Sequence, residues 1–338
     1  MTSSCVEKQE PAKIAEAGLY ADVSTETYHA DPCPEPSLSS SIAKLMLARS
    51  PAHARLAHPR LNPEQREETG DRLDFGSVAH ALMLGDDRGV CVVEADSYRT
   101  KAAKDQRDEA RANGQIPVLA DKYERALAMV AAGRAQLDRH EEAWEAFKSG
   151  YGKAEQTLIW RDGPESGRIW CRARIDWLPN NGNVIWDYKT TGAGADPDNW
   201  VRTMLNTGGD IQAGFYRRGV EKQLGIEAPH FRFVVQETEA PYALAVHELD
   251  PHFLGVAFRK ADAAVENWSW CLRHDRWPGY AGRVHYLECP PWEANRWEDR
   301  DQEQGDRSSL LETSLRWQAP DAATGQAVVE HFCQGDAP

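Results

Sequence analysis

The sequence lacks the features of a membrane-spanning or disulfide-bonded protein. No run of apolar residues approaches the roughly 20 that a membrane-spanning helix needs. The opening residues, MTSSCVEKQEPAK, contain no apolar stretch of the kind that directs secretion. The 7 cysteines are scattered and show no paired zinc spacing, which favours reduced thiols. We therefore expect a cytoplasmic protein that makes no membrane contact.

An excess of basic residues, the usual mark of a nucleic-acid-binding protein, is also missing. The formal net charge is −14, whereas phosphate contacts need Lys and Arg. The shortage of basic residues is uneven along the chain. Residues 151–220 carry nine basic and eight acidic residues, whereas residues 291–338 carry four basic and ten acidic residues. A locally neutral protein that holds cations can still bind a polyanion. The charge balance therefore excludes no class of function.

Two segments in the middle of the chain alternate in the manner of half-buried β-strands, residues 171–178 and 184–190. In the first segment, one face carries the apolar residues Cys171, Ala173, Ile175 and Trp177, and the other face carries Arg172, Arg174 and Asp176. In the second segment, Ile185, Asp187 and Lys189 share one face. This pattern predicts two adjacent strands of a sheet.

The turn between these strands brings two carboxylates together. Asn181-Gly182 is a strong signal for a two-residue hairpin loop, in which both residues must accept positive φ. With that loop, Asp176 lies opposite Asp187. Opposed Cβ atoms are roughly 5 Å apart, and like charges at that distance are destabilising. A hard cation such as Mg²⁺ prefers carboxylate oxygens and removes the repulsion.

A lysine next to these carboxylates suits phosphoryl chemistry. Lys189 follows Asp187 by two residues and shares its face of the strand. Beside a metal ion, an ammonium group can orient an attacking water and offset the charge that develops in the transition state. The plainer interpretation of an Asp on each strand of a hairpin is a solvated face, which would leave Lys189 without a role.

Asp on one strand and Asp-x-Lys on the next resembles the PD-(D/E)XK nuclease superfamily. Further motifs occur in the order found in its RecB-like branch, namely Phe75-Gly76-Ser77-Val78-Ala79-His80 as a Gly-x-x-x-His helix, Ala154-Glu155 before a core strand, and Asp210-Ile211-Gln212-Ala213-Gly214-Phe215-Tyr216 as a Gln-x-x-x-Tyr helix. The N-terminal segments Tyr28-His29-Ala30, Ser37-Leu38-Ser39-Ser40-Ser41-Ile42 and Ser50-Pro51-Ala52-His53 are similar to exodeoxyribonuclease VIII (RecE-type) proteins of bacteria and prophages. The resemblance covers about residues 25–250.

The resemblance implies a role for each matching residue. It makes His80, Asp176, Asp187 and the backbone carbonyl of Tyr188 metal ligands. It makes Lys189 the catalytic lysine and Glu155 a support of the metal site. It places Gln212 and Tyr216 along a DNA channel, and Arg172 and Arg174 are our candidates for phosphate contacts.

Each of these roles has a plainer alternative. A single histidine in an apolar helix is often a hydrogen-bonded structural residue, and this is the alternative for His80. Gln212 and Tyr216 share a helix face and could lie at a packing margin. Surface arginines such as Arg172 and Arg174 usually carry no function. The order of the motifs favours the functional interpretation.

The resemblance also implies cofactors and partners. We expect Mg²⁺, with Mn²⁺ as a substitute, and DNA as the substrate. Some RecB-like relatives hold an iron–sulfur cluster, but Cys271, Cys289 and Cys333 are far apart in this sequence, so we expect none. Exodeoxyribonuclease VIII resemblance implies a ring-like homo-oligomer and a single-strand annealing recombination protein as a partner.

The expected fold is α/β, a restriction-endonuclease-like core in which helices flank a central mixed sheet of four or five strands. We expect strands at residues 155–160, 168–178, 184–190 and 231–237, with a helix at 209–224. The predicted organisation is a flexible N-terminus (1–24), a mainly helical part with the His motif (25–150), a nuclease core with C-terminal helices (151–290) and an acidic tail (291–338).

The function we expect is Mg²⁺-dependent hydrolysis of DNA phosphodiester bonds. The resemblance favours an exonuclease that acts from duplex ends in phage-type recombination or repair. A structure-specific or single-strand endonuclease of the same fold is an open alternative. So is a catalytically silent DNA-binding or assembly protein, although it would not need the Asp/Asp/Lys set. A metal-binding protein without a nucleic-acid substrate would leave Gln212 and Tyr216 unexplained.

Overall fold

The computed structural model describes residues 13–62, 64, 71–85 and 89–303. The chain divides into two compact units, Met1–Ala281 and Gly282–Pro338. In the second unit, the described helix is α10 (Pro291–Glu303), which lies in the segment expected to be an acidic tail. Everything that follows concerns the first unit.

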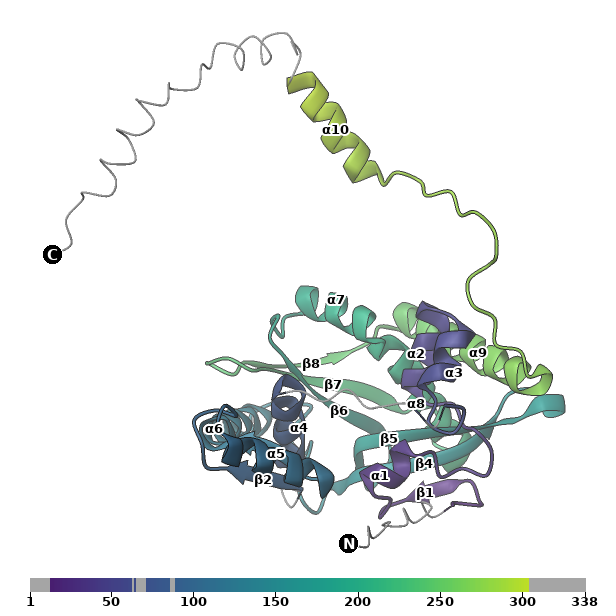
Figure 1. Ribbon diagram of the computed structural model, residues 1–338. Coiled ribbons are helices and arrows are strands. Elements are labelled where there is room, and N and C mark those ends of the chain that lie inside the picture. Colours follow the sequence, from purple (N-terminus) through teal and green to yellow (C-terminus); the bar gives the residue numbers. More distant parts are fainter. Residues whose placement is uncertain (1–12, 63, 65–70, 86–88, 304–338) are drawn as a thin grey trace, which may run out of the picture. The chain divides into compact units, whose positions relative to one another are not determined.

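A mixed sheet forms the centre of the first unit (Figure 1). Among the described residues, six strands join it in the order β1 (Gly18–Tyr20), β4 (Gly152–Asp162), β5 (Ile169–Pro179), β6 (Val184–Thr191), β7 (His230–Glu237) and β8 (Leu244–Glu248). Strands β6 and β7 are parallel and the other neighbours are antiparallel. The predicted mixed sheet with flanking helices is thus confirmed, with one or two strands more than expected.

Helices from both ends of the unit cover one face of the sheet. They are α2 (Ser40–Ala48), α3 (Pro51–Ala57), α7 (Pro197–Thr207), α8 (Gly209–Leu224) and α9 (Pro251–His274). Their apolar side chains pack with alternate strand residues such as Ile175, Ile185 and Phe233 in the larger core cluster. Helix α8 has the bounds predicted from the sequence. It carries Gln212 and Tyr216 towards the sheet.

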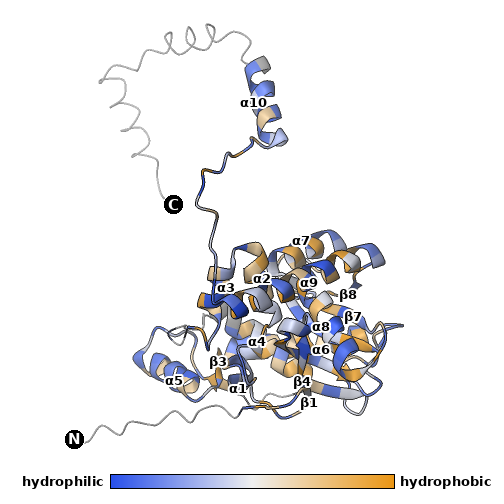
Figure 2. Ribbon diagram, turned by 90° about the vertical axis from the view of Figure 1, so that its right-hand side faces the viewer, coloured by the Kyte–Doolittle hydropathy of each residue, from blue (hydrophilic) through white to orange (hydrophobic). Residues whose placement is uncertain are grey.

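The opposite face carries a second core. Helix α4 (Asp71–Leu84), with the His motif, and α6 (Ala120–Leu137) pack there against Trp177, Trp186 and Tyr188. Helix α5 (Lys101–Ala112) lies beside them and is predominantly hydrophilic (Figure 2). At the β1 end, α1 (Thr25–His29) and its neighbouring N-terminal residues lie near the same sheet.

Several elements differ from the sequence predictions. The N-terminal segment expected to be flexible contains β1, which pairs with β4 through Gly18 and Ile159. In the segment expected to be helical, β2 (Val90–Val93) and β3 (Ile116–Leu119) form a parallel two-stranded sheet on either side of α5. Both are short apolar runs beside strongly helical sequence, so their periodicity gives little signal. Residues 63 and 65–70 lie outside the described part.

The hairpin turn between β5 and β6 is also different from the prediction. The N–H of Gly182 donates to the carbonyl of Pro179 at 2.9 Å, which places Asn180 and Asn181 at the centre of the turn. Gly182 then adopts a left-handed φ of 68°. Proline has no N–H to donate but accepts well, which favours a turn that starts one residue earlier.

None of the described helices is long and apolar enough to cross a membrane.

Candidate active site

The candidate site lies where β5 and β6 separate. Trp177 pairs with Trp186, which is the register predicted from the sequence. Beyond this pair the backbone ladder stops, and the N–H of Tyr188 donates instead to Oδ2 of Asp176 at 2.9 Å. The side chain of Asp176 thus takes the place of a backbone acceptor. This hydrogen bond fixes the carboxylate between the two strands.

The alternation of β5 breaks at the same residue. Ile175 belongs to the core under α8, whereas Trp177 belongs to the core under α4, although two residues apart should share a face. This corrects the expectation that Ile175 and Trp177 lie on one face. Such a change of face re-aims the side chain that lies between the two residues. Here the side chain is that of Asp176.

Strand β4 is irregular at the matching position. Ala154 pairs with Trp177 and Gln156 with Ile175, so Glu155 is opposite Asp176 but is not paired with it. Glu155 has a φ of 54°, in the left-handed region. For a residue other than glycine this costs about 1–3 kcal/mol, and such residues cluster at functional sites. The strain turns the Glu155 carboxylate towards Asp176.

Helix α4 brings His80 to these two carboxylates. Nε2 of His80 lies 3.0 Å from Oδ2 of Asp176, and Nδ1 lies 3.6 Å from Oε1 of Glu155. One potential ligand atom from each of the three residues lies within 4.8 Å of the others. Imidazole nitrogen and carboxylate oxygen are ligands for divalent cations. The donor set therefore fits a divalent metal ion, and Glu155 is as well placed to hold it as the predicted ligands.

Asp187 lies next to this cluster on β6, with a side chain only 2% exposed. Its Oδ1 accepts a hydrogen bond of 2.7 Å from Nε2 of Gln212 on α8. Its Oδ2 lies 2.5 Å from Nζ of Lys189 but accepts no hydrogen bond of regular geometry. A buried carboxylate oxygen with an open coordination position also fits a nearby cation. Gln212 and Lys189 thus both contact Asp187.

The charges of the cluster shift one another. Burial is the main reason that the pKa of Asp187 rises to about 6, and the neighbouring Asp176 raises it further. Burial alone would also raise the pKa of Asp176, but the charges of His80 and Lys189 hold it below its usual value. Burial opposes the charge of Lys189, yet Asp187 and Asp176 raise the pKa of this lysine. One carboxylate is thus ionised readily, and the lysine stays charged.

Tyr188 and Tyr216 support the site from within the protein. The hydroxyl of Tyr188 donates to Oε1 of Gln236 at 2.7 Å, away from the cluster, so only its backbone reaches Asp176. Tyr216 is only 5% exposed, and its hydroxyl accepts a hydrogen bond of 3.4 Å from the N–H of Arg174. Tyr216 therefore lies beneath the site rather than along an open channel. A ligand role for the Tyr188 carbonyl stays a prediction.

The two arginines of β5 are engaged within the protein. Arg172 is buried, and its Nη1 lies 3.2 Å from Oδ1 of Asp31 and donates to the carbonyl of Ser37. This corrects the expectation that Arg172 contacts DNA, since a residue far away in the sequence neutralises it. Arg174 is bonded to Glu155 and to the carbonyl of Val23. The alternation of polar and apolar residues along the strand does not predict these partners of Arg174.

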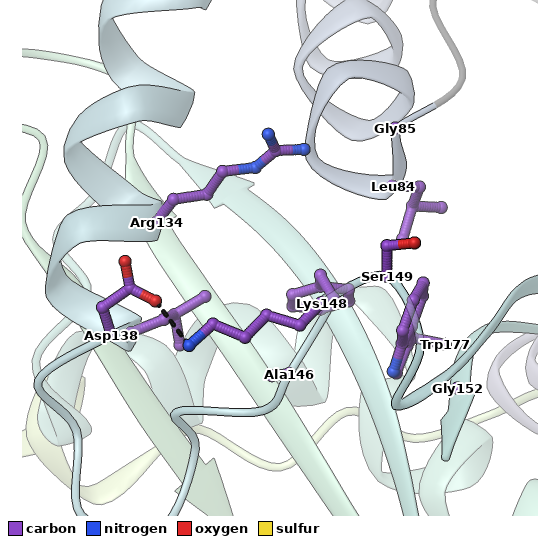
Figure 3. A pocket seen from close by; sticks show the side chains of 11 residues that line it. Leu84, Gly85, Arg134, Asp138, Ala146, Lys148, Ser149, Gly152 and Trp177 are labelled. Atoms are coloured by element: carbon purple, nitrogen blue, oxygen red, sulfur yellow. Dashed lines mark ion pairs between the residues drawn. The ribbon is translucent and has the colours of Figure 1, made fainter. Parts of the chain in front are cut away.

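A cavity of about 570 Å³ lies on the α4 side of the same strands (Figure 3). Its lining includes Leu84, Gly85, Arg134, Asp138, Lys148 and Trp177, and none of the cluster residues. Both cations have partners, because Arg134 donates to the carbonyls that end α4, and Lys148 pairs with Asp138 at 2.8 Å. This cavity is therefore explained by packing around the end of α4.

A second, smaller cavity lies between α4, α6 and the end of β6, and the cluster residues do not line it either. It has a volume of about 340 Å³ and is lined by Phe75 and Gly76 of α4, Lys122 and Arg125 of α6, and Thr190 of β6, among others. Gly76 lies one helical turn before His80, and Thr190 follows Lys189. None of the residues predicted for the site lies on α6. Only the tertiary fold brings Lys122 and Arg125 to the end of β6.

Comparisons with known proteins agree with this fold. The model of a family described as "PDDEXK-like domain of unknown function (DUF3799)" matches residues 39–290. A candidate exonuclease from Eubacterium rectale is similar in structure, with a TM-score of 0.52 and 13% sequence identity over 80% of this chain and 97% of that chain. At this identity the similarity concerns the fold alone.

A phage-related exonuclease from Haemophilus somnus 129PT matches with 13% identity and a TM-score of 0.24, over 59% of this chain and 95% of that chain. This similarity is too weak to support a statement about the fold. No protein with a curated description matches the chain.

Proposed function

The chain belongs to the family of PDDEXK-like domains (DUF3799), and from this premise we propose that it is a metal-dependent nuclease that hydrolyses DNA phosphodiester bonds. One observation carries the proposal. An imidazole and two carboxylates, from His80, Glu155 and Asp176, meet within 4.8 Å beside the Asp187–Lys189 pair. Two strand irregularities and a hydrogen bond from Tyr188 maintain this arrangement. A protein that used the fold only for assembly would not need them.

The residues that would hold the ion are His80, Asp176 and Asp187, with Glu155 as a further ligand and the Tyr188 carbonyl as the ligand that the resemblance adds. Mg²⁺ suits the carboxylate oxygens, and Mn²⁺ accepts the same oxygen and imidazole ligands. When bound, such an ion withdraws charge from the scissile phosphate and makes water a stronger acid. The remaining chemistry comes from the side chains of the chain itself.

Lys189 would act on the reacting groups. Its ammonium lies beside Asp187 at 2.5 Å, and the two carboxylates raise its pKa, so it stays positively charged. A fixed positive charge near the phosphate stabilises the additional negative charge of the transition state and orients the water that attacks it. Because Lys189 is about one-third exposed, it can reach a substrate while it remains paired.

Gln212 and Tyr188 hold the carboxylates for this task. The Gln212 amide donates to Asp187 from α8, and the Tyr188 N–H donates to Asp176 from β6. Partners of this kind orient metal ligands, and their loss commonly costs 10- to 100-fold in metal affinity or activity. In this proposal Gln212 positions Asp187 and also borders the DNA.

The DNA contacts would come from the cavity of about 340 Å³ between α4, α6 and the end of β6. Lys122 and Arg125 line it, next to Thr190 and the catalytic strand. Arg125 pairs with Glu239 at 3.2 Å, but both side chains are largely exposed, so the pair is weak and can exchange for a phosphate. Arg174 reaches the site only through Glu155. This cavity would bind the sugar–phosphate backbone of the DNA strand next to the phosphate that is cleaved.

The mode of cleavage follows from the resemblance to exodeoxyribonuclease VIII. We expect digestion of DNA from duplex ends in recombination or repair, by a homo-oligomer that encloses its substrate. An enclosing oligomer keeps a polyanion near a cleft whose own charge is close to neutral. A single-strand annealing protein is the partner this role implies, and the cytoplasm is the compartment in which it takes place.

The experiment that tests the mode is an electrophoretic assay with four substrates. The purified full chain is incubated with linear duplex, nicked, closed circular and single-stranded DNA, with Mg²⁺ or with EDTA. The proposal expects cleavage of linear duplex only with Mg²⁺ and resistance of closed circles. Rapid cutting of closed circles by a monomer would favour an endonuclease of the same fold. Binding without cleavage in every condition would indicate a catalytically silent protein.

A further inference from the structure

The two oxygens of Glu155 face different partners. Oε2 is bonded to Nε of Arg174, and Oε1 lies 3.6 Å from Nδ1 of His80. Both side chains are largely shielded from solvent, 27% exposed for Glu155 and 15% for Arg174. One oxygen is thus held by a fixed cation while the other is directed at the candidate metal position. A carboxylate held in this way has lost the freedom to rotate away from an ion.

Arg174 is itself held at several points. Its Nη1 donates to the carbonyl of Val23 at 2.9 Å, and its backbone N–H donates to the hydroxyl of Tyr216 at 3.4 Å. Its guanidinium lies 5.8 Å from the ring centre of Tyr28. A planar guanidinium with hydrogen bonds and an aromatic neighbour has few alternative positions. Arg174 is therefore a rigid support that holds Glu155 at the site.

That support comes from a part of the chain outside the family match. Val23 and Tyr28 precede residue 39, where the match to the family begins. Strand β1 ties this segment to the sheet next to Glu155, because Tyr20 pairs with Thr157 of β4. Tyr28 is buried, at 8% exposed. Residues of the N-terminal segment thus contact Arg174 directly.

The left-handed backbone of Glu155 requires such a support. A strained residue keeps its conformation only where its surroundings determine it more strongly than the strain opposes it. The bond to Arg174 is made from this left-handed conformation. The guanidinium also offsets the repulsion between the carboxylates of Glu155 and Asp176.

We propose that Arg174 is a positioning residue that fixes Glu155 as a ligand of the divalent metal ion, and that residues 23–28 hold Arg174 for this task. The inference rests on the proposed function, because the ion is that of the nuclease. It adds a residue that does not touch the ion and a segment that the family match leaves out. Arg174 acts by keeping one oxygen of Glu155 bound and the other available.

The test measures metal affinity without DNA. Mg²⁺ and Mn²⁺ are titrated calorimetrically into the full chain as wild type, Arg174→Gln and Arg174→Lys. The matched control is Arg161→Gln on β4, whose guanidinium donates to the carbonyl of Arg168 at the exposed surface. We expect Arg174→Gln to lower the affinity by about 10- to 100-fold, Arg174→Lys to recover part of it, and the control to bind like the wild type.

Two further measurements separate positioning from simple destabilisation. On a Glu155→Gln background, Arg174→Gln should cause little additional loss, because its effect passes through the carboxylate. Cleavage by Arg174→Gln should recover towards the wild-type rate at high Mg²⁺ concentration, since the defect is in binding of the ion. Thermal melts in EDTA establish that each variant is folded. If Arg174→Gln does not fold, Arg174→Lys, which retains the positive charge, is measured in its place.

The outcomes are distinct. Unchanged or tighter metal binding by folded Arg174→Gln would overturn the positioning role, and tighter binding would mean that the guanidinium competes with the ion. That result would leave the proposed nuclease intact. If the wild type binds neither ion, the metal-dependent function itself is wrong, and this inference is wrong with it.

Discussion

Nε2 of His80 lies 3.0 Å from Oδ2 of Asp176, although α4 and β5 are far apart in the sequence. The second ring nitrogen faces Glu155. Burial works against a charged imidazole, but the two carboxylates raise the pKa of His80 above its usual value. An imidazole between two carboxylates is therefore stabilised as a cation without metal, and a metal ion would take over that role.

The first prediction concerns this histidine. His80→Ala removes one ligand atom while the helix around it keeps its apolar packing. We expect the increase in melting temperature caused by Mg²⁺ or Mn²⁺ to be smaller in His80→Ala, because a ligand stabilises the folded state by RT ln(1 + [L]/Kd) and a weaker site has a larger Kd. An increase equal to that of the wild type would show that His80 is a structural residue.

The second prediction separates the lysine from the metal. Lys189→Ala should lose about 10²- to 10⁴-fold in kcat, because a charged group beside the reacting phosphate contributes that much. Its metal-induced change in melting temperature should remain. Single-turnover cleavage and metal titration on the same protein test this. A folded Lys189→Ala that no longer binds metal would instead make Lys189 part of the metal site.

The third prediction concerns the DNA path. Each phosphate contact contributes about one to the slope of log affinity against log salt concentration. The double variant Lys122→Gln, Arg125→Gln should therefore bind duplex DNA more weakly and lower that slope by about two. The matched control is Arg168→Gln, at an exposed position near the far end of β4 and β5. Binding is measured in EDTA, so that cleavage does not interfere.

A slope that is unchanged in the double variant, with the same affinity as the wild type, would place the DNA elsewhere. A loss in Arg168→Gln that is half as large, and thus equal for each charge removed, would mean that only overall charge matters. Either result would leave the metal cluster unaffected.

The fourth prediction concerns stability and pH. Asp162 is buried at the end of β4, 2.6 Å from Nε of Arg218 and 2.7 Å from Nζ of Lys222. Burial alone would raise the pKa of Asp162, but these partners lower it from 3.8 to about 2. The folded state thus binds this proton less readily than the unfolded state. Its contribution is present above about pH 4 and is lost as the pH falls towards 2.

The size of this contribution is roughly 2–3 kcal/mol, because one pKa unit corresponds to about 1.4 kcal/mol. Urea unfolding of the wild type and of Asp162→Asn from pH 6 to pH 2 measures it. The difference in free energy of unfolding between the two proteins should shrink as the pH falls. A difference that stays constant over this range would contradict the lowered pKa.

Much of the fold could be predicted from the sequence because its signals are local. Alternation identified the four long core strands, and the apolar spacing identified α8 with its bounds. Strands β2 and β3 were not predicted, because four-residue apolar runs beside strongly helical segments have no distinctive period. The edge strand β1 has only three residues. Its pairing with β4 depends on residues far along the chain.

The candidate site was predicted in part for the same reason. The common face of Asp187 and Lys189 follows from alternation and the hairpin register from the turn signal, and Trp177 does pair with Trp186. The break in β5 at Asp176 and the left-handed Glu155 leave no pattern in the sequence, since both depend on neighbouring strands. The ion pair of Arg172 with Asp31 is likewise a tertiary contact.

The central claim is that the carboxylates between β5 and β6 hold a metal ion for hydrolysis of DNA. Asp187 tests it most directly, since it is buried, has a raised pKa and contacts both Lys189 and Gln212. The measurement is cleavage of linear duplex DNA by the wild type and by Asp187→Ala, with Mg²⁺ and with EDTA. We expect cleavage by the wild type only when Mg²⁺ is present and no cleavage by Asp187→Ala, which should melt as a folded protein in EDTA. Undiminished cleavage by Asp187→Ala would contradict it.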